Sequence, residues 1–342
     1  IEKINPDILG ISAVTRRHYS MCEILKRTTT KYKIVGGPHT TYYPTECKKA
    51  GANAVFIGQL ADLEFKRILK SKFKGIINCN TNINKIKFPN RKLLDVNKYF
   101  YKGKILFESE KRLPMFSSVG CPNKCTFCNV QHSQIQFKNP KIVVDEMEHL
   151  IEVGAKNIHI LDDNFNINSQ HLKRILDEIE KRKLNIEWSG RGQVRMDLSL
   201  IPRMKKLGFK RIHVGFEALD DKILKWFNKP QTVKEIEKFC KIMNKNDIEI
   251  LAYFILGSPL ETKKYKEKLS QRIKELGIKF PYFNILFPEP NTSYYKSLLL
   301  DKHYTNDYWK EFMQNPIPNF RIPYPYEDKK LRKLIKFIDG LK

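Results

Sequence analysis

The feature that most limits the possible folds is an alternation of short apolar runs with amphipathic segments along most of the chain. In the first part, the predicted strands cover residues 7–13, 33–36 and 54–57, and the predicted helices cover residues 17–26, 44–50 and 62–70. Strands that alternate with helices in this way predict parallel βαβ units.

The same alternation resumes on a larger scale from about residue 104. Strands are predicted near residues 115–119, 157–161, 186–189, 211–214, 248–255 and 282–286, with helices at residues 143–153, 170–181 and 233–244 between some of them. Six strand–helix repeats in about 185 residues predict an open, partial (β/α)6 barrel rather than a complete eightfold one. In such barrels the chemistry lies on the loops that follow the strands.

The predicted fold class is therefore α/β, with four segments. They are a small parallel α/β domain at 1–77, a linker at 78–103, a partial barrel at 104–300, and a helical or irregular extension at 301–342. The linker is predicted because residues 78–97 are rich in Asn, Lys and Pro and show no clear period.

Composition restricts the possible partners. Lys and Arg outnumber Asp and Glu by 63 to 37, giving a net charge of +26, which attracts polyanions. However, the lysines are spread along the chain and no basic-aromatic motif accompanies them, so a nucleic-acid substrate is not favoured. Abundant Lys, Ile and Asn are also typical of an AT-rich genome or a heat-adapted proteome. No apolar run approaches the roughly 18 residues of a membrane span.

The cysteines fall into two groups. Seven cysteines, without a secretion signal, indicate a reducing cytoplasm rather than a disulfide framework. The chain opens on Ile1 rather than Met, which is consistent with a start inside a longer protein. Four cysteines stand alone, as small buried hydrophobes do: Cys22, Cys47, Cys79 and Cys240.

Cys121, Cys125 and Cys128 have ligand spacing and follow the first predicted barrel strand. Three thiolates can bind three irons of a [4Fe-4S] cubane and leave the fourth iron open to a small molecule. A structural zinc site is the alternative, with His132 as the fourth ligand, but a single cysteine triplet is a poor zinc site.

The C-x-x-x-C-x-x-C pattern, with Phe127 before the last cysteine, resembles the radical S-adenosylmethionine (SAM) superfamily. The resemblance implies that SAM chelates the open iron through its amino and carboxylate groups. It also implies reductive cleavage of SAM to a 5′-deoxyadenosyl radical and an electron donor such as ferredoxin or flavodoxin. Phe127 is then expected near the adenine.

Further segments match the family in the expected order. Asp162, Asp163 and Asn164 follow a barrel strand where the family receives the SAM amino group; a helix N-cap at Asn164 or Asn168 is the alternative. Paired carboxylates and an amide suit an ammonium group.

The next two strands supply the remaining candidate SAM contacts. Ser189, Arg191 and Arg195 resemble the segment that contacts ribose and carboxylate, although an arginine on the surface is equally typical. Gly215 and Glu217 resemble a fourth-strand Gly-x-Glu element, in which the glycine lets the backbone approach SAM. Glu217 could instead favour the positive end of the next helix.

Within the superfamily the chain resembles the cobalamin-binding subgroup. Residues 6–12, the turn at 35–41 and residues 56–58 resemble the third to fifth strands of a flavodoxin-like cobalamin domain, while segments like its first two strands are absent. An ordinary turn also explains Gly36-Gly37-Pro38. Cobalamin is therefore a possible cofactor that we expect to bind weakly or not at all, with His39 lining a pocket or facing solvent.

The resemblance implies an enzyme that modifies an unactivated carbon of an unknown small-molecule, lipid or cofactor substrate, with methyl transfer the commonest outcome. Carbon–carbon bond formation, rearrangement or oxidation without cobalamin is the second hypothesis. A basic iron-sulfur protein that binds RNA is the third.

Overall fold

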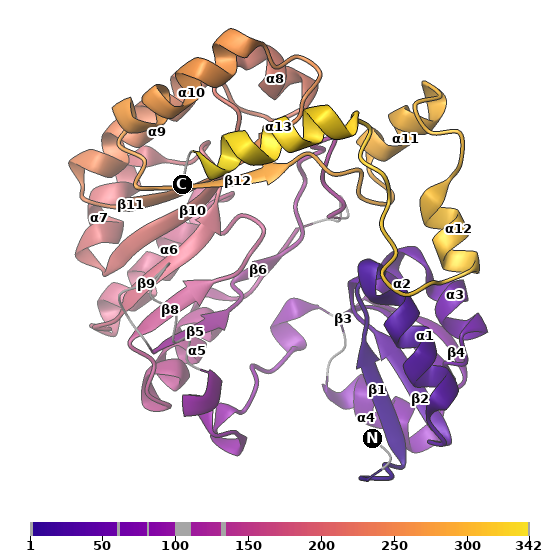
Figure 1. Ribbon diagram of the computed structural model, residues 1–342. Helices are drawn as coiled ribbons and strands as arrows, with labels where there is room; N and C mark the ends of the chain where they lie inside the picture. The colour runs from indigo at the N-terminus through magenta and orange to yellow at the C-terminus, as the bar shows by residue number, and fades with distance from the viewer. Residues whose placement is uncertain (1–2, 60–61, 81, 100–110, 131–134, 341–342) are drawn as a thin grey trace. The chain divides into compact units, whose positions relative to one another are not determined.

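The computed structural model describes residues 3–59, 62–80, 82–99, 111–130 and 135–340 (Figure 1). The chain forms two compact units: unit 1 comprises residues 1–87 and 288–325, and unit 2 comprises residues 88–287 and 326–342. The predicted start of the barrel at residue 104 and the alternative zinc ligand His132 lie outside the described residues.

Unit 1 contains a parallel sheet whose strands are hydrogen-bonded in the order β1-β2-β3-β4. Its elements are β1 (Ile8–Ser12), α1 (His18–Arg27), β2 (Tyr32–Gly36), α2 (Pro38–Tyr42), α3 (Pro44–Lys49), β3 (Ala54–Gln59), α4 (Asp62–Ser71), β4 (Gly75–Asn80), α11 (Ser293–Leu300) and α12 (Tyr308–Gln314), with 3-10 turns at Thr15–Arg17 and Ile83–Lys85. The alternation of residues 1–77 is reproduced, but β4 pairs with β3 and so takes up residues that the sequence assigned to the linker.

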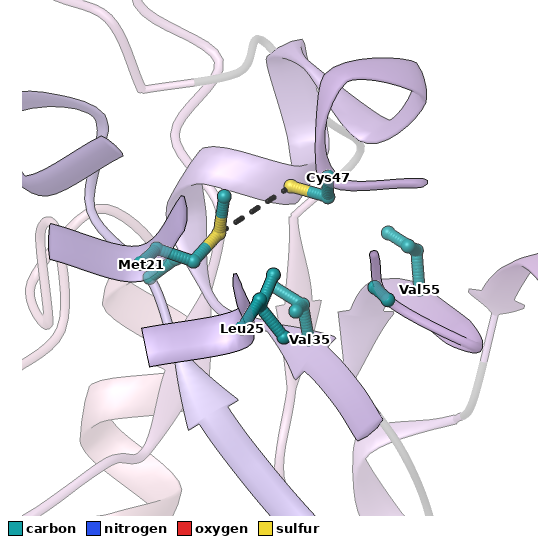
Figure 2. Packing of buried hydrophobic residues seen from close by; sticks show 7 residues of the cluster. Met21, Leu25, Val35, Cys47 and Val55 are labelled. Carbon is teal, nitrogen blue, oxygen red and sulfur yellow. Dashed lines mark hydrogen bonds between the residues drawn. The ribbon is translucent and has the colours of Figure 1, made fainter. Parts of the chain in front are cut away.

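One of two hydrophobic clusters in the described part of unit 1 lies between α1, α3 and the sheet (Figure 2). Met21 and Leu25 of α1 meet Val35 and Val55 of the strands, and the Cys47 thiol lies 3.8 Å from the Met21 sulfur. These five side chains are at most 2% exposed, which is the packing expected where strands are covered by helices. By contrast, β1 has one neighbouring strand among the described residues, and its side chains are exposed or half-buried.

The segment 288–325 packs with unit 1 although it is far from it in sequence. The His18 Nε2 lies 3.3 Å from the Met313 carbonyl oxygen of α12, and the His18 and Phe312 rings are 5.8 Å apart. The sequence placed residues 288–300 in the barrel and the rest in an extension. By its contacts, the whole segment 288–325 instead belongs to unit 1.

Unit 2 contains six parallel strands in the order β12-β11-β10-β9-β8-β5. Its elements are β5 (Arg112–Met115), β6 (Ser118–Val119), β7 (Gln136–Phe137), α5 (Pro140–Glu152), β8 (Asn157–Ile160), α6 (Ser169–Lys181), β9 (Glu187–Gly192), α7 (Ile201–Lys206), β10 (Phe209–Glu217), α8 (Asp221–Trp226), α9 (Val233–Lys245), β11 (Glu249–Leu256), α10 (Lys263–Glu275), β12 (Phe280–Ile285) and α13 (Asp328–Asp339), with 3-10 turns at Arg91–Leu93, Val96–Tyr99 and Leu198–Leu200. Within the described residues β5 and β12 do not pair, so the predicted open, partial barrel is confirmed.

Local sequence explains where several barrel helices begin. Thr232 accepts a hydrogen bond from the Glu235 backbone, and the Glu235 side chain accepts one in return, forming a capping box at the start of α9. Pro140 at the first turn of α5 follows the N-cap Asn139. None of the helices in the described ranges has both the length and the apolar character that crossing a bilayer requires.

Candidate functional site

The cysteine loop is held at both ends by a short antiparallel ladder. β6 precedes the loop and pairs with β7 beyond it, with Ser118 opposite Phe137. The first predicted barrel strand is therefore two elements: β5 enters the barrel sheet and β6 leaves it. This ladder brings the loop back to the carboxyl end of β5, where the chemistry of such barrels lies.

The middle of the loop is braced by the end of α8. The Thr126 amide donates to the Phe227 carbonyl oxygen at 2.9 Å, and the Asn228 side chain donates to the Lys124 carbonyl oxygen at 2.7 Å. The Phe127 and Phe227 rings meet edge to face, with centroids 5.1 Å apart. Phe127 is half-buried, and its place beside an adenine stays a prediction.

Two of the three cysteine sulfurs accept hydrogen bonds. The Asn164 side chain donates to the Cys121 sulfur at 3.3 Å, and the Val130 amide donates to the Cys128 sulfur at 3.4 Å. Such donors favour a thiolate and tune the potential of a bound cluster. Asn164 thus reaches the cysteine loop, and its contact with a SAM amino group stays a prediction.

Burial opposes ionisation of the free thiols. Burial raises the pKa of Cys125 to about 11 and, although less so, raises the pKa of Cys128. In both cases the Lys229 ammonium acts in the opposite direction. The loop is therefore a site where thiolates form when a cation compensates their charge.

Glu217 and Lys229 form a buried ion pair beside this loop. Their charged atoms are 2.8 Å apart, and the side chains are 8% and 14% exposed. Burial alone lowers the pKa of Lys229, but Glu217 and the nearby Cys125 outweigh it, so the pKa is raised. The ammonium remains charged at neutral pH.

Gly215 makes room for this pair. A Cβ at position 215 would lie 2.1 Å from a Glu217 carboxylate oxygen and 2.8 Å from the Lys229 nitrogen. Glu217 itself has a φ of +64°, a left-handed conformation that is rare for this residue type. The sequence analysis explained Gly215 by the close approach of a cofactor. The structure adds a second explanation, since a side chain at this position would collide with the ion pair.

Asp162 has its hydrogen-bonding capacity taken up inside the protein. It is 1% exposed and accepts hydrogen bonds from the Ser117 amide at 2.7 Å, the Ser117 hydroxyl at 2.5 Å and the Ser118 hydroxyl at 2.6 Å. The sequence expected this carboxylate to receive a SAM amino group. The structure shows it holding the strand ends that lead to Cys121, and its contact with SAM stays a prediction.

Asp163 and Arg191 are the more accessible charged pair at this end of the barrel. Burial raises the pKa of Asp163, while the Arg191 guanidinium and the Gly120 amide oppose that shift. Arg191 donates to the Leu161 carbonyl oxygen, and its buried Nε has no hydrogen-bond partner among the described residues. These two residues are placed to contact a ligand bound at the cysteine loop.

Ser189 and Arg195 are engaged elsewhere. Ser189 is 1% exposed, and its hydroxyl lies 2.8 Å from the His159 Nδ1. Arg195 forms an ion pair with Glu235, in which the side chains are 54% and 38% exposed. Both side chains have protein partners in this structure, and their contacts with ribose and carboxylate stay predictions.

His39 differs from the sequence expectation of a pocket-lining or solvent-facing side chain. It is fully buried, with its Nε2 3.0 Å from the His18 Nδ1 and its Nδ1 3.3 Å from the Thr15 hydroxyl. Gly37 before it has a φ of +92°, and a Cβ there would lie 2.9 Å from the Ala13 backbone. This turn is closed by packing within unit 1.

Lys229, Phe227 and Asn228 were missed by sequence reasoning. They come just after a short helix, and no local pattern links them to cysteines about 100 positions earlier. A lysine directly after an aromatic residue and an asparagine is too common a combination to mark a site. The contact arises only when α8 folds onto the loop.

The barrel unit matches a known family. Residues 115–273 match the model of the radical SAM superfamily. An uncharacterized methyltransferase of Pyrococcus horikoshii is 27% identical over 349 residues, covering 91% of this chain and 73% of that protein. The anaerobic magnesium-protoporphyrin IX monomethyl ester cyclase of Rubrivivax gelatinosus is 24% identical over 336 residues, covering 87% of this chain and 59% of the cyclase.

Solved structures share the fold. The radical SAM methyltransferase TsrM of Kitasatospora setae, with cobalamin and a [4Fe-4S] cluster bound, aligns with a TM-score of 0.65 and 15% identity over 84% of this chain and 63% of its own. The cobalamin-dependent radical SAM enzyme OxsB, with aqua-cobalamin bound, aligns with a TM-score of 0.65 and 17% identity over 91% of this chain and 48% of its own. The chain thus spans less than two thirds of either structure.

Residues 115–273 therefore form a domain of the radical SAM superfamily of enzymes, a family that uses a [4Fe-4S] cluster and SAM. The donor set fits that cluster, since three cysteines on one loop can each bind a different iron. In the described part of the chain, no three His, Cys, Asp or Glu side chains are arranged to hold a single metal ion. A cubane does not need the three sulfurs to meet at one point.

Proposed function

We propose that this chain cleaves SAM reductively at a [4Fe-4S] cluster held by Cys121, Cys125 and Cys128, and so modifies an unactivated carbon of its substrate, with methyl transfer as the outcome. One observation carries the proposal. The cysteine loop, Asn164 and the Glu217–Lys229 ion pair come together at the carboxyl end of the barrel strands. Cys121, Cys125 and Cys128 would hold the cluster, which would supply the electron for reductive cleavage of SAM.

The chain's own residues prepare that site. The Asn164 and Val130 donors stabilise thiolates at Cys121 and Cys128. Lys229 offsets negative charge at Cys125 from within the protein, where few water molecules screen it. Arg191 and Asp163 are the charged groups that can hold the carboxylate and ammonium ends of an amino acid such as the methionine part of SAM.

The reductant is a proposal of the same kind. Reductive cleavage of SAM needs an external electron donor, such as a ferredoxin or flavodoxin, which is consistent with a cytoplasmic protein. Cobalamin remains a possible cofactor, because TsrM and OxsB, which share the fold, bind it. The turn at Gly37 and His39 is closed by packing, which supports the proposal that cobalamin binds only weakly there.

The test is anaerobic reconstitution of the chain with iron and sulfide, followed by reduction in the presence of SAM. We expect about four irons per chain and the release of 5′-deoxyadenosine. Cys125→Ala should abolish both the brown chromophore and this product. Cys22→Ala is the matched control, because Cys22 is a half-buried cysteine of unit 1 outside the loop. A full cluster in Cys125→Ala would refute the ligand assignment.

A further inference from the structure

The inward face of the barrel strands is unusually polar. The interior of (β/α) barrels is commonly filled by branched aliphatic side chains. In unit 2, alternate positions on five adjacent strands place guanidinium, imidazole and phenol groups on one face of the sheet. These residues are Arg112 of β5, His159 of β8, Arg191 of β9, Arg211 and His213 of β10, and Tyr253 of β11.

These side chains contact one another across the strands. The His159 and His213 rings are 4.5 Å apart, and the His213 Nδ1 lies 3.2 Å from the Tyr253 hydroxyl. The Tyr253 ring in turn meets Tyr282 of β12, with centroids 5.8 Å apart. Because Tyr282 is 52% exposed while His159 is 5% exposed, the row of contacts runs from the interior to solvent.

The positive charge of this face resides on the arginines. Burial and then the Arg112, Arg211 and Arg191 guanidiniums lower the pKa of His213 to about 3, so its imidazole is neutral at pH 7. Burial, His213 and the same arginines also lower the pKa of His159. The Arg211 guanidinium also forms an ion pair with Glu249, so part of this positive charge is offset within the sheet. The three guanidiniums together still lower the pKa of both imidazoles.

One donor on this face lacks a partner. The Arg191 Nε is buried and has no hydrogen-bond acceptor in the part of the chain that the structure describes. Buried donors are almost always satisfied, by protein, water or ligand. An acceptor supplied by a bound ligand, either the SAM carboxylate or the substrate, would satisfy this nitrogen.

We propose that this cationic inner face binds an anionic group of the substrate, a carboxylate or a phosphate on a small organic molecule. The inference rests on the proposed function, since it names the substrate class of the same site. Planar guanidinium forks match the oxygens of either anion, and the histidines and Tyr253 add neutral donors. A macromolecule is not favoured, because the face is built from strand side chains that are half-buried or buried.

The position of this face also sets the length of the substrate. His213 precedes Glu217 by four residues on β10, which is at most about 13 Å, because the strand is irregular between Gly215 and Glu217. Glu217 lies beside the cysteine loop. A molecule whose anion binds at the histidines therefore reaches the reaction site with a chain or ring system of about that length.

Calorimetric titration of the reconstituted full chain tests this inference. Octanoate and octyl phosphate are the anionic probes, and octylammonium and octanol are the matched controls. We expect binding of at least one anion and no comparable binding of the controls. Arg112→Gln should weaken anion binding about tenfold or more, as loss of a hydrogen bond to a charged group does. Arg174→Gln, an exposed arginine on α6, should leave it unchanged.

The two probes distinguish the carboxylate from the phosphate. Tyr253→Phe is a second variant, for use if Arg112→Gln fails to fold. It removes one hydroxyl without changing the charge. It should weaken anion binding by a smaller factor than Arg112→Gln. SAM cleavage without substrate should be the same in Arg174→Gln as in the unchanged chain. Anion binding no tighter than octylammonium binding, or equal in Arg112→Gln and Arg174→Gln, would overturn the inference. Absence of SAM cleavage from the unchanged chain would instead count against the proposed function.

Discussion

The two parallel sheets of this protein use their strands in different ways. In unit 1, Val35 and Val55 pack beneath helices, and the turn after β2 is closed by His39 and Gly37. In unit 2 the strands bury apolar side chains such as Ile158 and Ile160 between inward polar ones such as His159. The same βαβ pattern therefore gives a self-contained scaffold in one unit and a chemically active inner face in the other.

The difference teaches that the surroundings of the buried polar groups, rather than their burial or the fold class, distinguish the two units. Both units bury a pair of histidines in contact: His18 with His39, and His159 with His213. The first pair is sealed by the Met313 carbonyl and Phe312. The second lies among arginines. Four predictions test this comparison.

The largest effect is expected at the buried ion pair of the barrel. Lys229→Met leaves the Glu217 carboxylate buried without its partner, which typically costs about 3–5 kcal/mol. Denaturant unfolding of the apoprotein measures this cost. The double variant Glu217→Gln with Lys229→Met should recover much of the stability. If the single and double variants were equally destabilised, the pair would not be coupled.

A smaller effect is expected at the base of the cysteine loop. Asp162→Asn removes the charged acceptor of three hydrogen bonds, which typically costs about 1.5–3 kcal/mol. Iron content after reconstitution should fall, while the SAM affinity of the chains that hold a cluster should not. Asp197→Asn is the control, because Asp197 accepts similar bonds from Ser199 at an exposed position. If Asp162→Asn keeps its full iron content but binds SAM more weakly, Asp162 contacts the SAM amino group as the sequence predicted.

Acid should affect both units through their buried histidines. Burial and His18 lower the pKa of His39 to about 3 in the folded chain, whereas an unfolded histidine titrates near 6.5. The unfolded state therefore binds more protons between these values, so stability falls as the pH decreases through that window. From pH 7 to pH 5 each such histidine costs about 2 kcal/mol. His39→Gln and His159→Gln should each reduce the loss of unfolding free energy between pH 7 and pH 5 by the contribution of one histidine. If either variant loses as much stability as the unchanged chain, that histidine is not buried in its neutral form.

The smallest effect is expected on the barrel surface. Arg195→Ala breaks an exposed ion pair with Glu235, which is typically worth at most about 1 kcal/mol. SAM affinity should stay unchanged, whereas Arg191→Gln should reduce it. Isothermal titration with SAM compares the two variants. A loss of affinity in Arg195→Ala would mean that this arginine leaves Glu235 for the ligand.

The sequence alone determined the α/β class, the partial barrel and the cysteine loop. Hydrophobic periodicity reports which face of each element is buried, and ligand spacing within one loop is a local property. For the same reason most predicted strands and helices of residues 1–77 lie within one or two residues of the observed ones.

Only the tertiary structure decided which polar residues are available for chemistry. Asp162, Ser189 and Arg195 have the residue types that a cofactor site needs, yet each is engaged by a protein partner. Lys229 had no local signal and became part of the site through packing. Hydrogen bonds and ion pairs join residues far apart in sequence, as Ser117 and Asp162 are, and the pattern of one segment does not record the partner that another segment will bring.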